Sequence, residues 1–153
     1  MSIPADYEMP DFDELLGPFF QRIEQQHNPL LLALLERVAA EKYREWAHCE
    51  EFKSDRDQLL NCAKREEQIA RKIEDLYPDP KSIEEEIALV IPELAQASEE
   101  LFGGRSIPHQ MAVLAVGERW GSKVWDSLAR DERASNKQQV LLSCRPLEEA
   151  NAE

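Results

Sequence analysis

The sequence predicts an all-α protein: a four-helix bundle of two antiparallel hairpins with a long helical crossover, plus a short N-terminal helix. Three observations predict it. The 153 residues are rich in Ala, Leu, Glu, Lys and Arg and include only 5 Gly, which favours helices over strands. Apolar residues recur every three or four positions along extended stretches. Capping residues, prolines and glycines mark where these stretches begin and end.

Each expected helix has a signal at one end or both. Asp11 has the spacing of an N-cap for the first helix, and Asn28 followed by Pro29 marks the start of the second. Ser106 opens the fifth helix, and the Gly103–Gly104 pair ends the helix before it. The six expected helices span residues 11–26, 29–51, 55–77, 83–102, 107–130 and 136–153, in a single domain that covers 1–153.

The lengths of the connections predict how these helices pair. Short turns join the helices within 29–77 and within 107–153, so each of these segments should fold as an antiparallel hairpin. Residues 83–102 form the crossover between the hairpins, and Pro92 should kink it.

Composition excludes several functional classes. The chain has 31 acidic and 18 basic residues, a net charge of −13, with no basic cluster that would bind a nucleic acid. No apolar run approaches the roughly 20 residues of a membrane span, and the acidic N-terminus lacks the features of a signal peptide, so a cytoplasmic location is expected. Cys49, Cys62 and Cys144 form no CxxC motif, which is typical of reduced thiols. Signatures of hydrolases and nucleotide-binding proteins are missing from the sequence.

Four glutamates stand where helical periodicity expects apolar residues. Glu66, Glu118 and Glu148 each lie in the middle of an apolar stripe, and Glu41 continues the stripe that ends at Val38. An isolated buried carboxylate costs several kcal/mol, so four of them require protons, Arg or Lys partners, or metal ions. Two divalent cations would balance four carboxylates, whose oxygens suit iron or manganese.

An internal repeat and the hairpin geometry bring these glutamates together. The motif Leu-x-x-Cys-x-x-x-Glu-x-x-x-Ala occurs at 59–70 and again at 141–152, an offset of 82 residues. Glu41 and Glu118 are 77 residues apart, so the two halves align with a slip of five. The glutamates of each expected hairpin have midpoints at 53.5 and 133, inside the expected turns. We therefore expect the four carboxylates to converge inside the bundle.

This pattern resembles the ferritin-like superfamily of di-iron carboxylate proteins, over residues 29–153. In that family the first helix of each hairpin supplies a Glu and the second supplies a Glu-x-x-His motif. The resemblance implies that Glu41 and Glu118 bind one metal ion each, and that Glu66 and Glu148 bridge the two ions. It also implies, if iron binds, Fe(II) oxidation or a reaction that depends on O2 or peroxide.

The sequence departs from the family at both histidines. Ile69 and Asn151 stand where the two histidines would be, and the only Glu-x-x-His motif is Glu45 with His48, on another helix. Three alternatives stay open: an all-carboxylate site, a site that uses His48, and a site that has lost its metal. The expected ligands are Glu41, Glu66, Glu118 and Glu148, with His48 as an additional candidate.

Two other readings belong to different functional classes. One is a non-catalytic helical module that uses the glutamates for internal ion pairs or for a partner-binding groove. The other is an acidic adaptor that binds a basic protein through its charge of −13. The apolar side chains of Phe12, Phe19, Phe20 and segment 30–35 exceed what one helix face needs, which predicts a homodimer.

Overall fold

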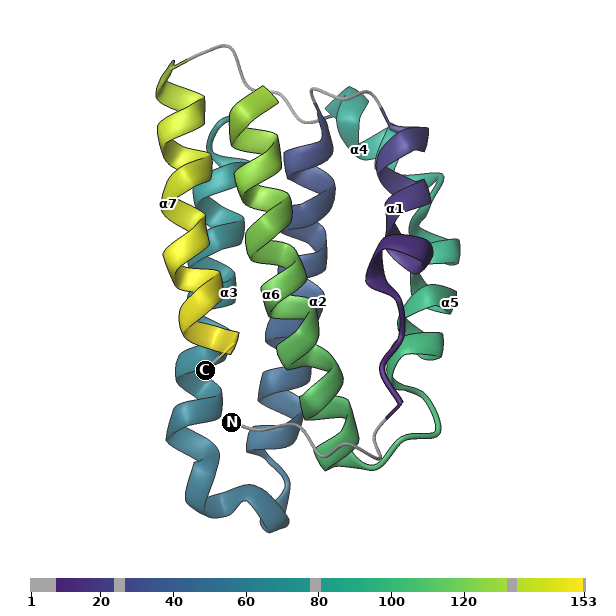
Figure 1. Cartoon of the computed structure of the whole chain (residues 1–153), viewed down its shortest axis with the longest axis vertical. Helices are drawn as coiled ribbons and strands as arrows, with labels where there is room; N and C mark the ends of the chain where they lie inside the picture. Colours follow the sequence, from purple (N-terminus) through teal and green to yellow (C-terminus); the bar gives the residue numbers. More distant parts are fainter. Residues whose placement is uncertain (1–7, 24–26, 78–80, 132–134, 153) are drawn as a thin grey trace.

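A computed structural model describes residues 8–23, 27–77, 81–131 and 135–152 (Figure 1). Over these ranges the chain forms seven α-helices and one short 3-10 segment, and no strand, which confirms the all-α prediction. The helices are α1 (Phe12–Arg22), α2 (Asn28–Ala47), α3 (Arg56–Glu74), α4 (Lys81–Ala88), α5 (Ile91–Phe102), α6 (Ile107–Asp131) and α7 (Ser135–Ala152), and the 3-10 segment η2 is Glu50–Asp55.

Four long helices, α2, α3, α6 and α7, pack side by side and are called the four-helix core below (Figure 1). Helix α2 contacts α3 and α6, and α7 contacts the same two helices from the other side. Each helix runs antiparallel to the two that it contacts, while α3 and α6 run in the same direction (Figure 1). One face of every helix is therefore turned toward a common interior.

The other three helices, α1, α4 and α5, lie along one side of this core, next to α2 and α6 (Figure 1). Helix α1 begins as predicted, because the Asp11 side chain accepts a hydrogen bond from the backbone N–H of Glu14 (3.1 Å). Trp120 of α6 donates a hydrogen bond from Nε1 to Asp13 (2.7 Å), and its ring lies 5.9 Å from that of Phe12. Helix α1 is thus attached to α6 by both polar and aromatic contacts.

The crossover is two helices rather than the one kinked helix that the sequence predicts. Helix α4 ends at Ala88, and α5 begins at Ile91 with Pro92 in its first turn. Proline has no N–H to donate to the preceding turn, but its backbone angle suits the start of a helix, so the chain stops and restarts there. Helix α5 ends at Phe102, and Gly104 follows with a φ of 72°, a conformation that glycine adopts without strain.

The interior of the four-helix core is apolar above and below a polar middle. Its fully buried large side chains are Trp46, Trp125, Leu31, Leu32, Ile69, Ile73 and Leu141. Glu66 and Glu118 are buried as completely as these residues. In the part of the chain that the structure describes, none of the helices has the length and apolarity needed to cross a membrane.

Candidate metal centre

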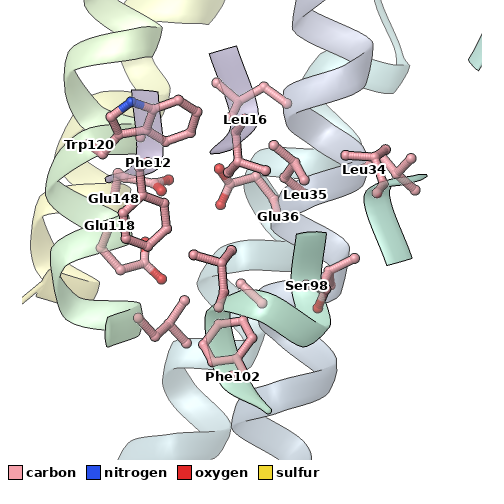
Figure 2. Close-up of a pocket in the computed structure, with 18 of the residues that line it drawn as sticks. Phe12, Leu16, Leu34, Leu35, Glu36, Ser98, Phe102, Glu118, Trp120 and Glu148 are labelled. Carbon is pink, nitrogen blue, oxygen red and sulfur yellow. The ribbon is translucent and has the colours of Figure 1, made fainter. Parts of the chain in front are cut away.

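Four glutamates, one from each helix of the four-helix core, meet in its interior. Glu36 of α2, Glu66 of α3, Glu118 of α6 and Glu148 of α7 each offer a carboxylate oxygen, and these oxygens lie within 4.8 Å of one another. All four residues are buried, with exposed fractions of 4%, 0%, 1% and 2%. We call these residues the glutamate cluster; Figure 2 shows Glu36, Glu118 and Glu148 around a common space.

Three of the four expected acidic residues, Glu66, Glu118 and Glu148, are in this cluster, but Glu41 is not. The prediction that Glu41 lies inside the bundle is wrong, because its side chain is 76% exposed and pairs with Arg44. Five residues separate Glu41 from Glu36, which corresponds to about 140° around a helix. The two side chains therefore lie on nearly opposite sides of α2, and Glu36 is the one that faces the interior.

The position of the first turn explains this error. The sequence predicts that the first long helix continues to residue 51, but α2 ends at Ala47 and the 3-10 segment η2 fills most of the gap before α3. The turn is therefore centred nearer to residue 51 than to residue 53.5. Glu36 and Glu66 are equidistant from residue 51, so the rule of equal distances from the turn selects Glu36 once the turn is placed correctly.

His48 does not join the cluster either. It is exposed at the C-terminal end of α2, where its Nδ1 lies 2.7 Å from the carbonyl oxygen of Arg44. Twelve residues separate it from Glu36, which is about 18 Å along a helix. The alternative in which His48 is a ligand of the same site is therefore wrong.

The internal repeat contains a signal that identifies Glu36. Glu36 and Glu118 are 82 residues apart, the same offset that separates Glu66 from Glu148. The local sequences agree as well, since Leu-Ala-x-x-Glu-Arg occurs at 32–37 and again at 114–119. With Glu36 in place of Glu41 the slip of five disappears, and the two hairpins repeat with one constant offset.

Two polar side chains hold individual carboxylates of the cluster. The Tyr43 hydroxyl donates a hydrogen bond to Oε1 of Glu118 (2.9 Å), and the Asn151 amide donates one to Oε1 of Glu66 (2.8 Å). Arg65 donates to the oxygen of the same Asn151 side chain, which orients the amide so that its NH2 group faces Glu66. Asn151 occupies a position where the ferritin-like pattern has histidine, and here it supports a glutamate.

Other oxygens of the cluster have no donor. Oε2 of Glu66, of Glu118 and of Glu148 is buried without a hydrogen-bond partner. Within the described ranges, no Lys, Arg or His forms an ion pair with a residue of the cluster. Gly121 leaves room for one of these carboxylates, because a Cβ at that position would lie 2.4 Å from Oε1 of Glu148. Such undersatisfied buried oxygens are unusual in native proteins and are typical of a site that binds a further group.

Burial and mutual repulsion shift the proton equilibria of the cluster. Burial, and then the neighbouring carboxylates, raise the pKa values of Glu36 and Glu118 well above their usual range. Burial and the charge of Glu66 raise the pKa of Glu148 to about 8. Burial and Glu118 raise the pKa of Tyr43, which keeps its phenol protonated. Without a cation, the cluster therefore retains protons at neutral pH.

The nearby thiols do not extend the donor set. Cys62 and Cys144 each lie one helical turn before a glutamate of the cluster, and both are buried. Burial raises the pKa of Cys62, and it raises the pKa of Cys144 to about 12, so both thiols stay protonated at neutral pH. The available donors are carboxylate oxygens, which suit hard or borderline cations such as Mg, Mn and Fe.

Similarity to other proteins adds nothing to this geometry. Comparison of the chain with protein-family models, with curated proteins and with solved structures finds no match in any of the three.

Proposed function

We propose that the protein is a ferritin-like metalloprotein in which Glu36, Glu66, Glu118 and Glu148 bind two divalent cations, iron or manganese. The observation that carries the proposal is the set of buried Oε2 atoms, on Glu66, Glu118 and Glu148, that face a shared interior without a donor. A bound cation would satisfy these oxygens and would offset the repulsion between carboxylates that helps to raise the pKa values of Glu118 and Glu148.

The fold supports the ferritin-like part of the proposal. Two antiparallel hairpins are joined by a long crossover, and each of their four helices contributes one glutamate at the same level. The constant offset of 82 residues relates Glu36 to Glu118 and Glu66 to Glu148, so the two halves of the cluster have equivalent places in their hairpins. A site of two ions bound between equivalent pairs of ligands fits this internal symmetry.

The residues around the cluster have separable roles in this proposal. If iron is bound, it would supply Fe(II) oxidation or another redox step with O2 or peroxide. Tyr43 holds its phenolic proton against Oε1 of Glu118, and Asn151 keeps Glu66 in one orientation. The apolar side chains of α1 and α5 reduce the access of bulk water from their side of the core.

Metal content is the direct test. Protein expressed in medium supplemented with iron and manganese is purified, and its metals are measured by plasma mass spectrometry. We expect about two equivalents of Fe or Mn per chain. The variants Glu36→Gln and Glu66→Gln should lose most of this metal, because each replaces a charged carboxylate ligand with a neutral amide of nearly the same size. The matched control is Glu41→Gln, an exposed position on the same helix as Glu36, which should keep the wild-type content.

Two results would contradict the proposal. One is wild-type protein that carries no Fe or Mn after such expression and takes up neither ion in a titration. The other is an equal loss of metal from Glu41→Gln and Glu36→Gln. Circular dichroism of each variant separates a lost ligand from a lost fold.

A non-catalytic helical module is the second candidate, and two observations favour it. Positions 69 and 151 lack the histidines of the ferritin-like pattern, and the raised pKa values of Glu36, Glu118 and Glu148 allow protons to replace cations at these three residues. In that case a chelator should leave the unfolding temperature unchanged. A basic protein partner recruited by the charge of −13 should dissociate steeply as salt is added.

A further inference from the structure

A cavity of about 410 Å³ separates the four-helix core from α1 and α5 (Figure 2). Its volume lies within the range of about 300–1,000 Å³ that is usual for small-molecule sites. Glu118 and Glu148 line it on the side opposite Ser98 of α5, and Glu36 also borders it (Figure 2). The cavity therefore adjoins the glutamate cluster directly.

The rest of the wall is almost entirely apolar. Representative side chains come from four helices: Phe12, Leu16, Leu35, Leu94, Phe102 and Leu114. Ser98 and the indole of Trp120 are the other polar side chains among the described lining residues, and the indole N–H is already bonded to Asp13. A polar molecule would leave its hydrogen bonds unmade against such a wall, whereas an aliphatic one would gain from burial.

The mouth of the cavity lies between α2 and α5. Two of its lining residues, Val38 of α2 and Ile91 of α5, are exposed by 37% and 47%. They are among the few large apolar side chains that the described surface exposes, and Leu89, just before α5, is exposed by 76%. An apolar entrance leads from solvent into an apolar cavity, with carboxylates at one wall.

We propose that this cavity binds a small uncharged aliphatic molecule, which would place one end against the glutamate cluster. An anionic ligand is disfavoured, because three acidic side chains line the wall. The molecule would be the substrate of the metal site, and to that extent the inference rests on the proposed function. Binding itself depends only on the apolar wall and is measured without metal.

The probe is 1-octanol that carries bromine on its terminal carbon. Bromine quenches indole fluorescence at contact, and Trp120 lines the cavity. We expect the fluorescence quenching to saturate with probe concentration. In Trp120→Phe the quenching should be much smaller, although calorimetry should show that this variant still binds the alcohol. Unlabelled hexanol, heptanol and octanol should compete, with affinity rising about fourfold per added methylene group.

Variants of α5 locate the binding site. Ser98→Phe places a ring in the cavity and should weaken probe binding at least tenfold. Gln96→Phe is the matched control, since it adds the same ring on the same helix at an exposed position that does not line the cavity. If Ser98→Phe fails to fold, Ala95→Phe replaces it in this test. Ala95 is an exposed residue that also lines the cavity, so its ring should likewise weaken probe binding.

Glu66→Gln separates this inference from the proposed function. Glu66 belongs to the glutamate cluster but is not among the residues that line the cavity, so this variant should lose metal and still bind the probe. Saturable probe binding in a protein that never takes up metal would uphold the cavity and overturn the metal site. The cavity proposal is overturned by quenching that does not saturate, or by equal effects of Ser98→Phe and Gln96→Phe on probe binding.

Discussion

The glutamate cluster brings together carboxyl groups that cannot all be ionised at low cost. Glu66, Glu118 and Glu148 each bury one oxygen without a donor, and an unsatisfied buried polar group costs about 1–3 kcal/mol. Two neutral donors, Tyr43 and Asn151, satisfy only part of the acceptor capacity. The oxygens that these donors leave unsatisfied require protons or cations. Both compete for the same oxygens, so pH decides which of them binds.

The stability of the metal-free protein should therefore decrease as pH rises. Burial and Glu66 raise the pKa of Glu148 from the usual 4.5 to about 8, so the folded state binds this proton more tightly than the unfolded state does. The resulting stabilisation is complete below about pH 4.5 and is lost as pH rises through about 8. Glu36 and Glu118, whose pKa values are also raised, act in the same direction.

Urea denaturation of chelator-treated protein between pH 5 and pH 9 measures this effect. We expect the unfolding free energy to fall by several kcal/mol across the range, because each unit of pKa shift corresponds to about 1.4 kcal/mol. Glu148→Gln, which is neutral at every pH, should flatten the curve. A stability that is constant or that rises over this range would show that the carboxyls are ionised in the folded protein.

Each helix of the four-helix core supplies one glutamate, and the rotation of the helix about its axis decides which one. Helical periodicity places Glu66, Glu118 and Glu148 correctly, because each lies between apolar residues on both sides along its helix. It fails for α2, where apolar residues surround most of the first three turns and two glutamates five residues apart both fit a stripe. The end of α2 at Ala47 resolves this ambiguity, and helix ends are what local sequence predicts least well.

Gly121 of α6 leaves room for the carboxylate of Glu148 on α7. In Gly121→Ala the new Cβ would lie 2.4 Å from Oε1 of Glu148, so the carboxylate has to move. We expect a loss of about 1–3 kcal/mol in unfolding free energy, together with a lower metal content. Gly17→Ala in α1 is the control, because beyond its chain neighbours the new Cβ would meet nothing within 4 Å, and this variant should keep the wild-type metal content.

Metal analysis and urea denaturation of the two glycine variants check this prediction. If Gly121→Ala keeps both its metal and its stability, then the position of the Glu148 carboxylate is not limited by the contact with α6. Equal destabilisation by Gly17→Ala would indicate that a glycine is needed in α1 for a reason other than packing.

The chain carries a net charge of −13, and the part of its surface that the structure describes exposes few large apolar side chains. The predicted homodimer depended partly on Phe12, Phe19, Leu31 and Leu32, and the structure buries all four within the chain. The large apolar side chains that the described surface exposes are Val38, Leu89, Ile91 and Leu142, and three of them lie at or beside the mouth of the cavity. The homodimer stays a prediction, which sedimentation experiments can test. Most of the apolar side chains that remain exposed lie around the mouth of the cavity.

Cation binding should stabilise the whole fold, because the four ligands come from four different helices of the core. Manganese at 100 times its dissociation constant should add about 2.7 kcal/mol to the unfolding free energy, and a chelator should reverse this gain. The same gain is expected in Glu41→Gln, and none in Glu36→Gln. Differential scanning calorimetry checks this, and an unfolding temperature that responds to neither metal nor chelator would support the non-catalytic module.

The sequence by itself determined the helical class, the two hairpins and three of the four clustered glutamates. These features depend on propensity, periodicity and capping, which act within a few residues along the chain. Only the tertiary structure decided that Glu36 faces the interior, that Asn151 supports Glu66, and that α1 and α5 enclose a cavity beside the cluster. Each of these depends on how far a helix is rotated against segments distant in sequence, and packing between helices sets that rotation.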